Sequence, residues 1–323
     1  MSNYVRSDEL DRFELMANFN STIHRFIING LNPGLHYEVG DGKRLPIKRE
    51  FDHSEIIKKL VEIGVKQQKQ RAKYTETGAD FDPEFTADTL GEGIMSLCEA
   101  EDKLEAHILT THGITDTILF EEYDIPEDIQ EQMYANLPKN TSEYPVDRDV
   151  HVEYPEFLNQ YLEVVDLDDE QLDSAVETLR SLDSVTLREA AEETELSPLT
   201  VAQLRYDHDL YTDDERTTAA GRAVSLIVGS LFGRWDSDSE IPTLDDEILT
   251  FNDSNTPVTN LFTEALGELF EDSAQAEREL ESSLGNHPVD WLRENFFRHH
   301  HVDEYKPRGE RSPIYWQLES PNG

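Results

Sequence analysis

Residues 186–205 read TLREAAEETELSPLTVAQLR, and their spacing predicts two helices joined by a short turn. Thr186 and Glu189 have the spacing of a capping box, which marks the start of the first helix. Ser197 followed by Pro198 gives the second helix an N-cap and a proline at its first position. The residues suited to a shared core are Leu187, Ala190, Ala191, Leu196, Val201 and Leu204. This pattern predicts a helix-turn-helix-like unit over residues 186–206, with Glu195 in the turn where glycine is usual.

Helical periodicity continues on both sides of this unit. Apolar residues at intervals of three and four predict an amphipathic helix from Glu55 to about Tyr74. A second such pattern begins at Asp88, and Gly113 is predicted to stop that helix. Residues 123–152 are rich in Pro, Asp and Asn, which indicates a long connection.

Helical patterns then dominate from residue 155 to about residue 298, so we predict a mainly α fold with a mixed N-terminal segment. Changes in composition suggest three parts. They are a basic-faced segment at residues 1–85, a helix and long connection at residues 86–154, and a helical specificity or scaffold region at residues 155–323.

The chain is strongly acidic, with 69 Asp and Glu against 28 Lys and Arg and a formal net charge of −41. The acids are spread along the whole sequence, so the excess belongs to the whole surface. Such a charge repels DNA in dilute buffer, but at 1 M salt the Debye length falls to roughly 3 Å. We therefore expect a protein of a salt-accumulating, archaeal halophile, whose composition does not exclude a nucleic-acid partner.

Targeting signals and cysteine pairs are missing from the sequence. Residues 1–14 lack the apolar core of a signal peptide, and the apolar stretch at residues 224–232 is far below the ~20 residues that cross a bilayer. We therefore expect a cytoplasmic protein with no membrane partner. Cys98 is the single cysteine, which excludes disulfides and multi-cysteine metal sites, and we expect it to be a small buried apolar side chain.

The usual catalytic motifs are also missing. Gly91-Glu92-Gly93 has a helical context and no apolar strand before it, so it does not predict a cofactor loop. Glu101-Asp102-Lys103 has the acid-x-Lys spacing of a metal nuclease but falls on a helix, where a solvated face is the plain interpretation. The adjacent histidines at residues 299–301 diverge around a helix axis, so we expect no metal site there.

Three blocks in the last third of the chain carry a family resemblance. Residues 221–236 read GRAVSLIVGSLFGRWD, residues 291–297 read WLRENFF, and residues 311–318 read RSPIYWQL. Their order and spacing resemble the C-terminal part of BREX phage-defence adenine-specific DNA methyltransferases of the PglX type, and of related type IIG restriction–modification enzymes. The helix at residues 99–105 also looks like the region that follows the catalytic domain in this family. The resemblance covers residue 88 to the C-terminus.

The resemblance implies methyl transfer from S-adenosylmethionine to adenine N6 by the complete enzyme. This chain lacks the family's glycine-rich cofactor motif and its Asn-Pro-Pro-Tyr motif, of which residues 32–35 keep only the first two letters. We therefore expect no catalytic residue here, no cofactor bound by this chain, and no methyltransferase activity from the chain alone. S-adenosylmethionine is expected to bind the complete enzyme.

The sequence thus leads to one main hypothesis and two alternatives. The main one is a non-catalytic specificity or scaffold portion of an adenine-specific DNA methyltransferase system, from a truncated or split gene, that contacts DNA beside a separate methyltransferase polypeptide. A stand-alone helix-turn-helix regulator would instead bind DNA sequence-selectively by itself, whereas the main hypothesis predicts stable association with a separate methyltransferase. The second alternative is a purely structural interaction module.

Two groups of residues are candidates for DNA contact. The polar face of the helix at residues 55–74 is the densest cationic patch, and its lysines suit phosphate contacts. The candidate phosphate-binding residues are Lys58, Lys59, Lys66 and Lys69. On the second helix of the helix-turn-helix-like unit, Gln203 and Arg205 are candidates for reading bases, with Thr200 beside them.

Overall fold

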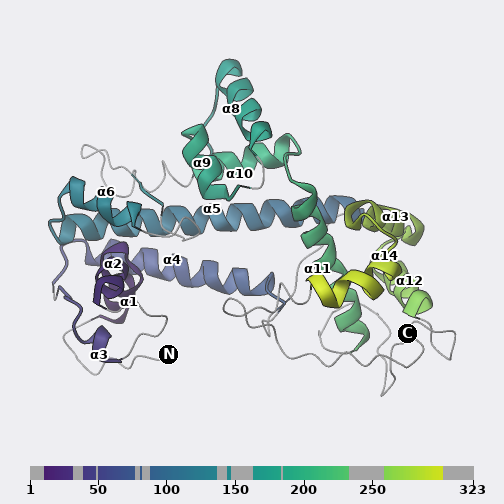
Figure 1. Cartoon of the computed structure of the whole chain (residues 1–323), viewed down its shortest axis with the longest axis horizontal. Helices are drawn as coiled ribbons and strands as arrows, with labels where there is room; N and C mark the ends of the chain where they lie inside the picture. The colour runs from purple at the N-terminus through teal and green to yellow at the C-terminus, as the bar shows by residue number, and fades with distance from the viewer. Residues whose placement is uncertain are drawn as a thin grey trace. The chain divides into compact units, whose positions relative to one another are not determined.

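A computed structural model describes residues 11–31, 39–48, 50–76, 81, 88–136, 144–146, 163–182, 185–232 and 258–300. Within these ranges every regular element is a helix, which confirms the mainly α prediction (Figure 1). The helices are α1 (Arg12–Asn20), α2 (Thr22–Leu31), α3 (Val39–Gly42), α4 (Ser54–Lys73), α5 (Leu90–Glu122), α6 (Glu127–Ala135), α8 (Asp169–Ser181), α9 (Leu187–Thr194), α10 (Pro198–Asp207), α11 (Asp213–Leu231), α12 (Val258–Leu269), α13 (Ser273–Leu284), α14 (Pro288–Trp291) and the π-helix η1 (Leu292–His300).

The chain forms two compact units, and the long helices α4 and α5 each contribute to both. Unit 1 consists of Met1–Lys69 and Asp102–Leu210. Unit 2 consists of Gln70–Glu101 and Tyr211–Gly323. The N-terminal turns of α5 therefore belong to unit 2 and its remaining turns to unit 1.

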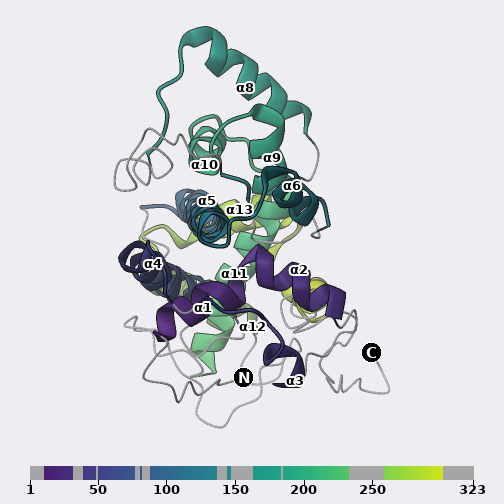
Figure 2. The ribbon, with the colours of Figure 1, turned by 90° about the vertical axis from the view of Figure 1, so that its left-hand side faces the viewer.

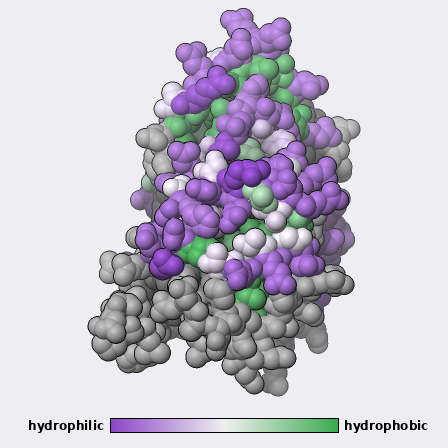
Figure 3. All heavy atoms as spheres, turned by 90° about the vertical axis from the view of Figure 1, so that its right-hand side faces the viewer, coloured by the Kyte–Doolittle hydropathy of each residue, from purple (hydrophilic) through white to green (hydrophobic). Residues whose placement is uncertain are grey.

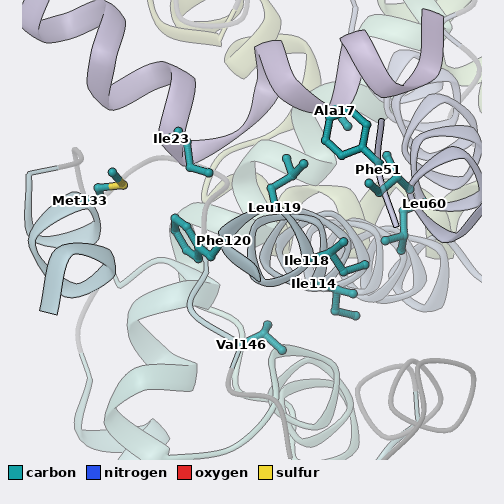
Figure 4. Packing of buried hydrophobic residues seen from close by; sticks show 11 residues of the cluster. Ala17, Ile23, Phe51, Leu60, Ile114, Ile118, Leu119, Phe120, Met133 and Val146 are labelled. Carbon is teal, nitrogen blue, oxygen red and sulfur yellow. The ribbon is translucent and has the colours of Figure 1, made fainter. Parts of the chain in front are cut away.

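In unit 1, helices pack on two sides of α5. Figure 2 shows α1, α2 and α4 on one side and α8, α9 and α10 on the other. On the first side, a buried cluster joins α1, α2, α4, α5 and α6, and Figure 4 shows its side chains pointing toward one another around the C-terminal turns of α5. Its members are Ala17, Ile23, Phe51, Ile57, Leu60, Ile114, Ile118, Leu119, Phe120, Met133 and Val146.

The second cluster of unit 1 joins α8, α9 and α10 to α5. Ala106 and Leu109 on α5 pack with apolar residues of these three helices, including Ala191 and Val201, which are fully buried. The local signals read from the sequence are present as expected. Thr186 forms a capping box with Glu189, and Ser197 caps α10 with Pro198 at its first turn.

Unit 2 packs α11, α12, α13, α14 and η1 with the first turns of α5. Polar groups tie α5 to its neighbours: Gly91 N donates to Glu279 Oε2 at 2.8 Å, and Arg216 Nη1 lies 3.2 Å from Met95 Sδ. Small residues of α11, among them Ala219, Ala220 and Ala223, are buried. Cys98 is a buried free thiol, as predicted.

The predicted end of the second helix is wrong, because α5 continues for nine residues past Gly113 to Glu122. The reason is a close approach of distant chain. A Cβ at position 113 would lie 2.1 Å from Tyr144 O and 2.5 Å from Val146 Cγ2. Glycine is therefore required here because residues 144–146 cross the helix, and this contact cannot be read from local sequence.

The interpretation of residues 123–152 as a long connection also needs correction, because α6 forms within it. Pro126 is its N-cap residue and two acids occupy its first turn. Met133 is buried in the first cluster, with Ile129 packed against it. Ile129 and Met133 are four residues apart and so lie on one apolar face, which packs this short helix against the cluster.

The surface agrees with the acidic composition. In the view of Figure 3, hydrophilic residues cover most of the coloured surface, and hydrophobic residues form smaller, separate areas. Across the ranges described, no helix combines the length and the apolar character needed to span a bilayer.

Candidate nucleic-acid interface

The strongest candidate interface is a basic face on α4, formed by Lys59, Lys66 and Lys69. All three lysines are exposed, and none forms an ion pair with another described residue. Lys66 follows Lys59 by seven residues, which is close to two helical turns, and Lys69 follows Lys66 by three, which is close to one turn. The three side chains therefore project from one side of α4. The helix rise places Lys66 about 10 Å, and Lys69 about 15 Å, along the axis from Lys59. We call these three residues the lysine face.

Lys58 does not belong to the lysine face. Its Nζ lies 3.4 Å from Glu55 Oε1 and 3.7 Å from Asp11 Oδ2, and its side chain is only 29 % exposed. The two carboxylates already balance its charge, so Lys58 has less to offer to a phosphate than its neighbours. Of the four lysines predicted for phosphate contact, the structure leaves three available.

A shallow hollow lies beside the first turns of α4. Phe13 and Ile56 supply its apolar part, while Lys58, Lys59 and three acids surround them. The acids are Asp11, Glu55 and Glu62. Because acids outnumber lysines in its lining, the hollow does not favour an anionic ligand, and the lysine face extends beyond it along α4.

The residues predicted to read bases lie mostly inside unit 1. Arg205 is 8 % exposed, and its Nη1 donates to Asp102 Oδ2 at 2.8 Å and Oδ1 at 3.1 Å. Thr200 is 1 % exposed, and its Oγ1 accepts from the backbone N–H of Val165 at 3.1 Å. Gln203 is half-buried, and its Nε2 donates to Asp207 Oδ1 at 2.8 Å. Seven of the ten residues of α10 are buried, so this helix packs in the core of unit 1.

The surface of α9 and the turn that follows it is acidic. Glu192, Glu193 and Glu195 are exposed there, where a DNA backbone would have to approach. Glu195 adopts the left-handed conformation with φ 55°, at the position where glycine is usual. The geometry of two helices and a turn is therefore present, but its charge and burial do not favour DNA contact.

The structure also reveals a polar cluster in unit 1 that sequence reasoning missed. The carboxylate of Glu122, at the end of α5, accepts from Lys48 Nζ at 2.6 Å, from His53 N at 2.7 Å and from His53 Nδ1 at 2.9 Å. Lys48 Nζ also donates to the backbone carbonyl of Glu122 at 2.8 Å. The neighbouring Tyr123 hydroxyl accepts from Lys48 N at 2.9 Å and donates to Asn18 Oδ1 at 2.6 Å. We call these five residues the Glu122 cluster.

Protonation in this region is set by burial and by these hydrogen bonds. Burial would raise the pKa of Glu122, but the hydrogen bonds from Lys48 and from the backbone at His53 and Asp52 outweigh it, so the pKa is lowered. The hydrogen bond to Glu122 raises the pKa of Lys48. Burial raises the pKa of Tyr123. The carboxylate and the ammonium are therefore both charged at neutral pH, and their hydrogen bonds hold Lys48 and His53 against the end of α5.

A second polar pair, Ser21 and His24, has the residue types of a nucleophile and its base. Ser21 Oγ lies 3.1 Å from His24 Nδ1, but Ser21 is 2 % exposed and His24 is fully buried. His24 Nε2 lies 2.7 Å from Pro46 O, and burial lowers the pKa of His24. Because no substrate reaches a buried pair of this kind, its role is structural.

The other sequence motifs considered as possible sites are explained by ion pairs or by their place on a helix. Glu101 pairs with Arg222 in unit 2, and Asp102 pairs with Arg205 in unit 1, so the acid-x-Lys spacing reflects two ion pairs on α5. Gly91-Glu92-Gly93 lies in the first turn of α5. Where the structure describes the chain, His, Cys, Asp and Glu form no group of three able to hold a metal ion. The side chains of residues 299–301, and the segments at 32–35, 233–236 and 311–318, lie outside the described residues.

Comparisons with known proteins add no relative. No protein-family model matches the chain, and neither a curated protein nor a solved structure matches it. The described residues form a helical protein of two compact units. It carries the lysine face in a strongly acidic chain.

Proposed function

We propose that the chain is a non-catalytic, DNA-contacting portion, serving specificity or as a scaffold, of an adenine-specific DNA methyltransferase system. It works beside a separate polypeptide that carries the catalytic motif and binds S-adenosylmethionine. The observation that carries the DNA contact is the lysine face: three exposed lysines on one helix that pair with no acid among the described residues, in a chain with 69 acids and 28 basic residues. The methyltransferase context rests on the family resemblance of the C-terminal blocks.

The charge balance supports a phosphate-contacting role for the lysine face. With acids so abundant, an exposed lysine readily finds a carboxylate, as Lys58 does with Glu55 and Asp11. The three lysines pair with no described acid, although Glu62 is exposed one helical turn from Lys59 and from Lys66. Three ammonium groups against one carboxylate leave a local cationic surface, and the short Debye length at high salt keeps distant acids from cancelling it. Ammonium groups of this kind are suited to phosphate oxygens.

A non-catalytic role is supported by the chemistry of the buried groups. Ser21 and His24 are buried, and Glu122 is buried while its partner Lys48 is partly exposed; both pairs are held by internal hydrogen bonds. The alternative of a stand-alone helix-turn-helix regulator has less support, because Thr200 and Arg205 on α10 are buried.

The first test is assembly and activity. A neighbouring reading frame that encodes the Asn-Pro-Pro-Tyr motif should yield a polypeptide that copurifies with this chain in molar KCl. Labelled S-adenosylmethionine should methylate DNA only when both polypeptides are present. Methyl transfer by this chain alone, or the absence of any association with such a polypeptide, would overturn the methyltransferase part of the proposal.

The second test addresses the lysine face within the assembled complex. The triple variant Lys59→Gln, Lys66→Gln, Lys69→Gln should weaken DNA binding, because it removes the three exposed charges. A matched control, Arg180→Gln, Arg278→Gln, Arg293→Gln, changes the net charge equally at three dispersed exposed positions. Equal DNA affinity of the two triple variants would show that the lysine face has no particular role.

A further inference from the structure

We infer that the chain holds duplex DNA through the phosphate backbone and does not read its base sequence. This inference rests on the proposed function. Of the two roles proposed there, it selects the scaffold and not the specificity portion. It comes from two observations in unit 1. Thr200, Gln203 and Arg205 on α10 are hydrogen-bonded within the protein, and the exposed cations of the part of α4 that belongs to this unit, residues 54–69, are all lysines.

The first observation concerns the groups that could recognise bases. A side chain reads a base edge only if its donors and acceptors are free to face the groove. The guanidinium of Arg205 is directed at Asp102 on α5, and the hydroxyl of Thr200 accepts from Val165 N and contacts Ser197 Oγ at 2.8 Å. Turning Arg205 outward would remove the cation that faces the largely buried carboxylate of Asp102, which is costly. Thr200 is 1 % exposed, so its hydroxyl does not face a groove. Gln203 would have to break its bond to Asp207 and enter an acidic surface.

The second observation concerns the lysine face itself. A lysine ammonium is a compact point charge with rotatable donors, which suits phosphate oxygens and lacks the planar fork of arginine. Lysine can also contact guanine O6 and N7, so the comparison of A·T-rich with G·C-rich duplexes tests the lysines themselves. Lys59, Lys66 and Lys69 extend over about 15 Å of α4, a span that covers several backbone phosphates. Gln70 follows directly and is exposed. Its amide could pair with an adenine, so it is the residue on α4 that the test must include.

Salt dependence gives the size of the expected effect. Three phosphate contacts predict a slope of log K against log salt of about −2.7, from about −0.9 for each contact. Between 0.5 M and 2 M KCl, this slope corresponds to a loss of affinity of about 40-fold. The chain alone should therefore bind DNA measurably at 0.5 M KCl. A linked partner that holds the same DNA at high effective concentration would add to this binding, which is what a scaffold beside a second polypeptide provides.

The experiment uses the full chain and labelled 20-base-pair duplexes of unrelated sequence, some A·T-rich and some G·C-rich. Affinities are measured by fluorescence anisotropy from 0.5 to 2 M KCl, for the parent, the triple lysine-to-Gln variant, Gln70→Ala and Gln203→Ala. We expect affinities that agree within about twofold across sequences, and a slope near −2.7 that falls toward zero in the triple variant. Gln70→Ala and Gln203→Ala should keep both the slope and the lack of sequence preference.

The outcomes separate this inference from the proposed function. A preference of tenfold or more for one sequence, removed by Gln70→Ala or Gln203→Ala, overturns backbone-only binding and leaves the DNA contact in place. No DNA binding by the parent, or the same slope in the parent and the triple variant, overturns the DNA role of the lysine face. If the triple variant loses the methyltransferase polypeptide while its salt slope is unchanged, the lysine face is a protein interface and both conclusions fail.

Discussion

Arg205 on α10 donates from one guanidinium nitrogen to both carboxylate oxygens of Asp102 on α5, at 2.8 and 3.1 Å. Their side chains are 9 % and 15 % exposed. This pair fixes the helix that the sequence assigned to base reading against the central helix of unit 1. A buried pair of charges stabilises little by itself, but removing one partner leaves the other charge uncompensated.

Arg205→Ala should therefore lower the free energy of unfolding by about 3 kcal/mol, because Asp102 would keep its charge without its partner. The control is Arg293→Ala, whose pair with Asp290 is half-exposed on both sides and should contribute less than about 0.5 kcal/mol. Urea unfolding in molar KCl measures both. Equal small effects would mean that Arg205 is not held in the core and is available to a ligand.

Gly113→Ala should destabilise unit 1, because the new methyl group would collide with Tyr144 O and Val146 Cγ2. Overpacking of this kind costs about 1–3 kcal/mol. Gly64 on α4 is the control, since a Cβ there meets nothing within 4 Å and alanine favours a helix by about 1 kcal/mol. The two substitutions should shift the thermal midpoint in opposite directions. A stabilising Gly113→Ala would show that residues 144–146 do not cross α5 so closely.

These glycines illustrate what the sequence could and could not predict. The bounds of α4 and the caps of α9 and α10 depend on neighbours within a few residues, so spacing alone predicted them. Gly113 and Arg205 have partners 31 or more positions away in the chain. Local spacing therefore gave the wrong helix end at Gly113 and did not reveal the pair between Arg205 and Asp102. The Glu122 cluster was missed for the same reason, because it joins Glu122 to residues about 70 positions earlier.

The Glu122 cluster predicts a loss of stability at acid pH. The folded-state pKa of Glu122 lies below its ordinary value of 4.5, so the unfolded chain binds this proton first. The stabilisation is therefore complete above the unfolded pKa and is lost as the pH falls from about 4.5 through the folded pKa. Glu122→Gln should cost about 2 kcal/mol at pH 7, through the lost charged hydrogen bonds, and should flatten the profile in this window.

The matched control for this prediction is Glu131→Gln, which alters an exposed acid on α6. It should leave both the stability at pH 7 and the acid slope close to those of the parent. Chemical unfolding at a series of pH values measures the effect. The contribution of His24 begins at higher pH, because its folded pKa lies below 6.5 and the unfolded chain therefore gains that proton first. An acid slope that survives Glu122→Gln would assign the loss to other carboxylates.

Salt dependence of the fold follows from the net charge of −41. At 1 M salt the acids repel only close neighbours, whereas at 0.01 M the Debye length reaches roughly 30 Å and the whole surface repels itself. Dilution should therefore unfold the chain, with loss of the helical signal in circular dichroism. Changing Glu170, Asp173 and Glu177 on the exposed side of α8 to neutral amides should move the midpoint to lower salt. The triple lysine-to-Gln variant, which makes the charge more negative by the same amount, should move it to higher salt. If both variants unfold at the parent's midpoint, salt stabilises the protein by a mechanism other than screening of charge.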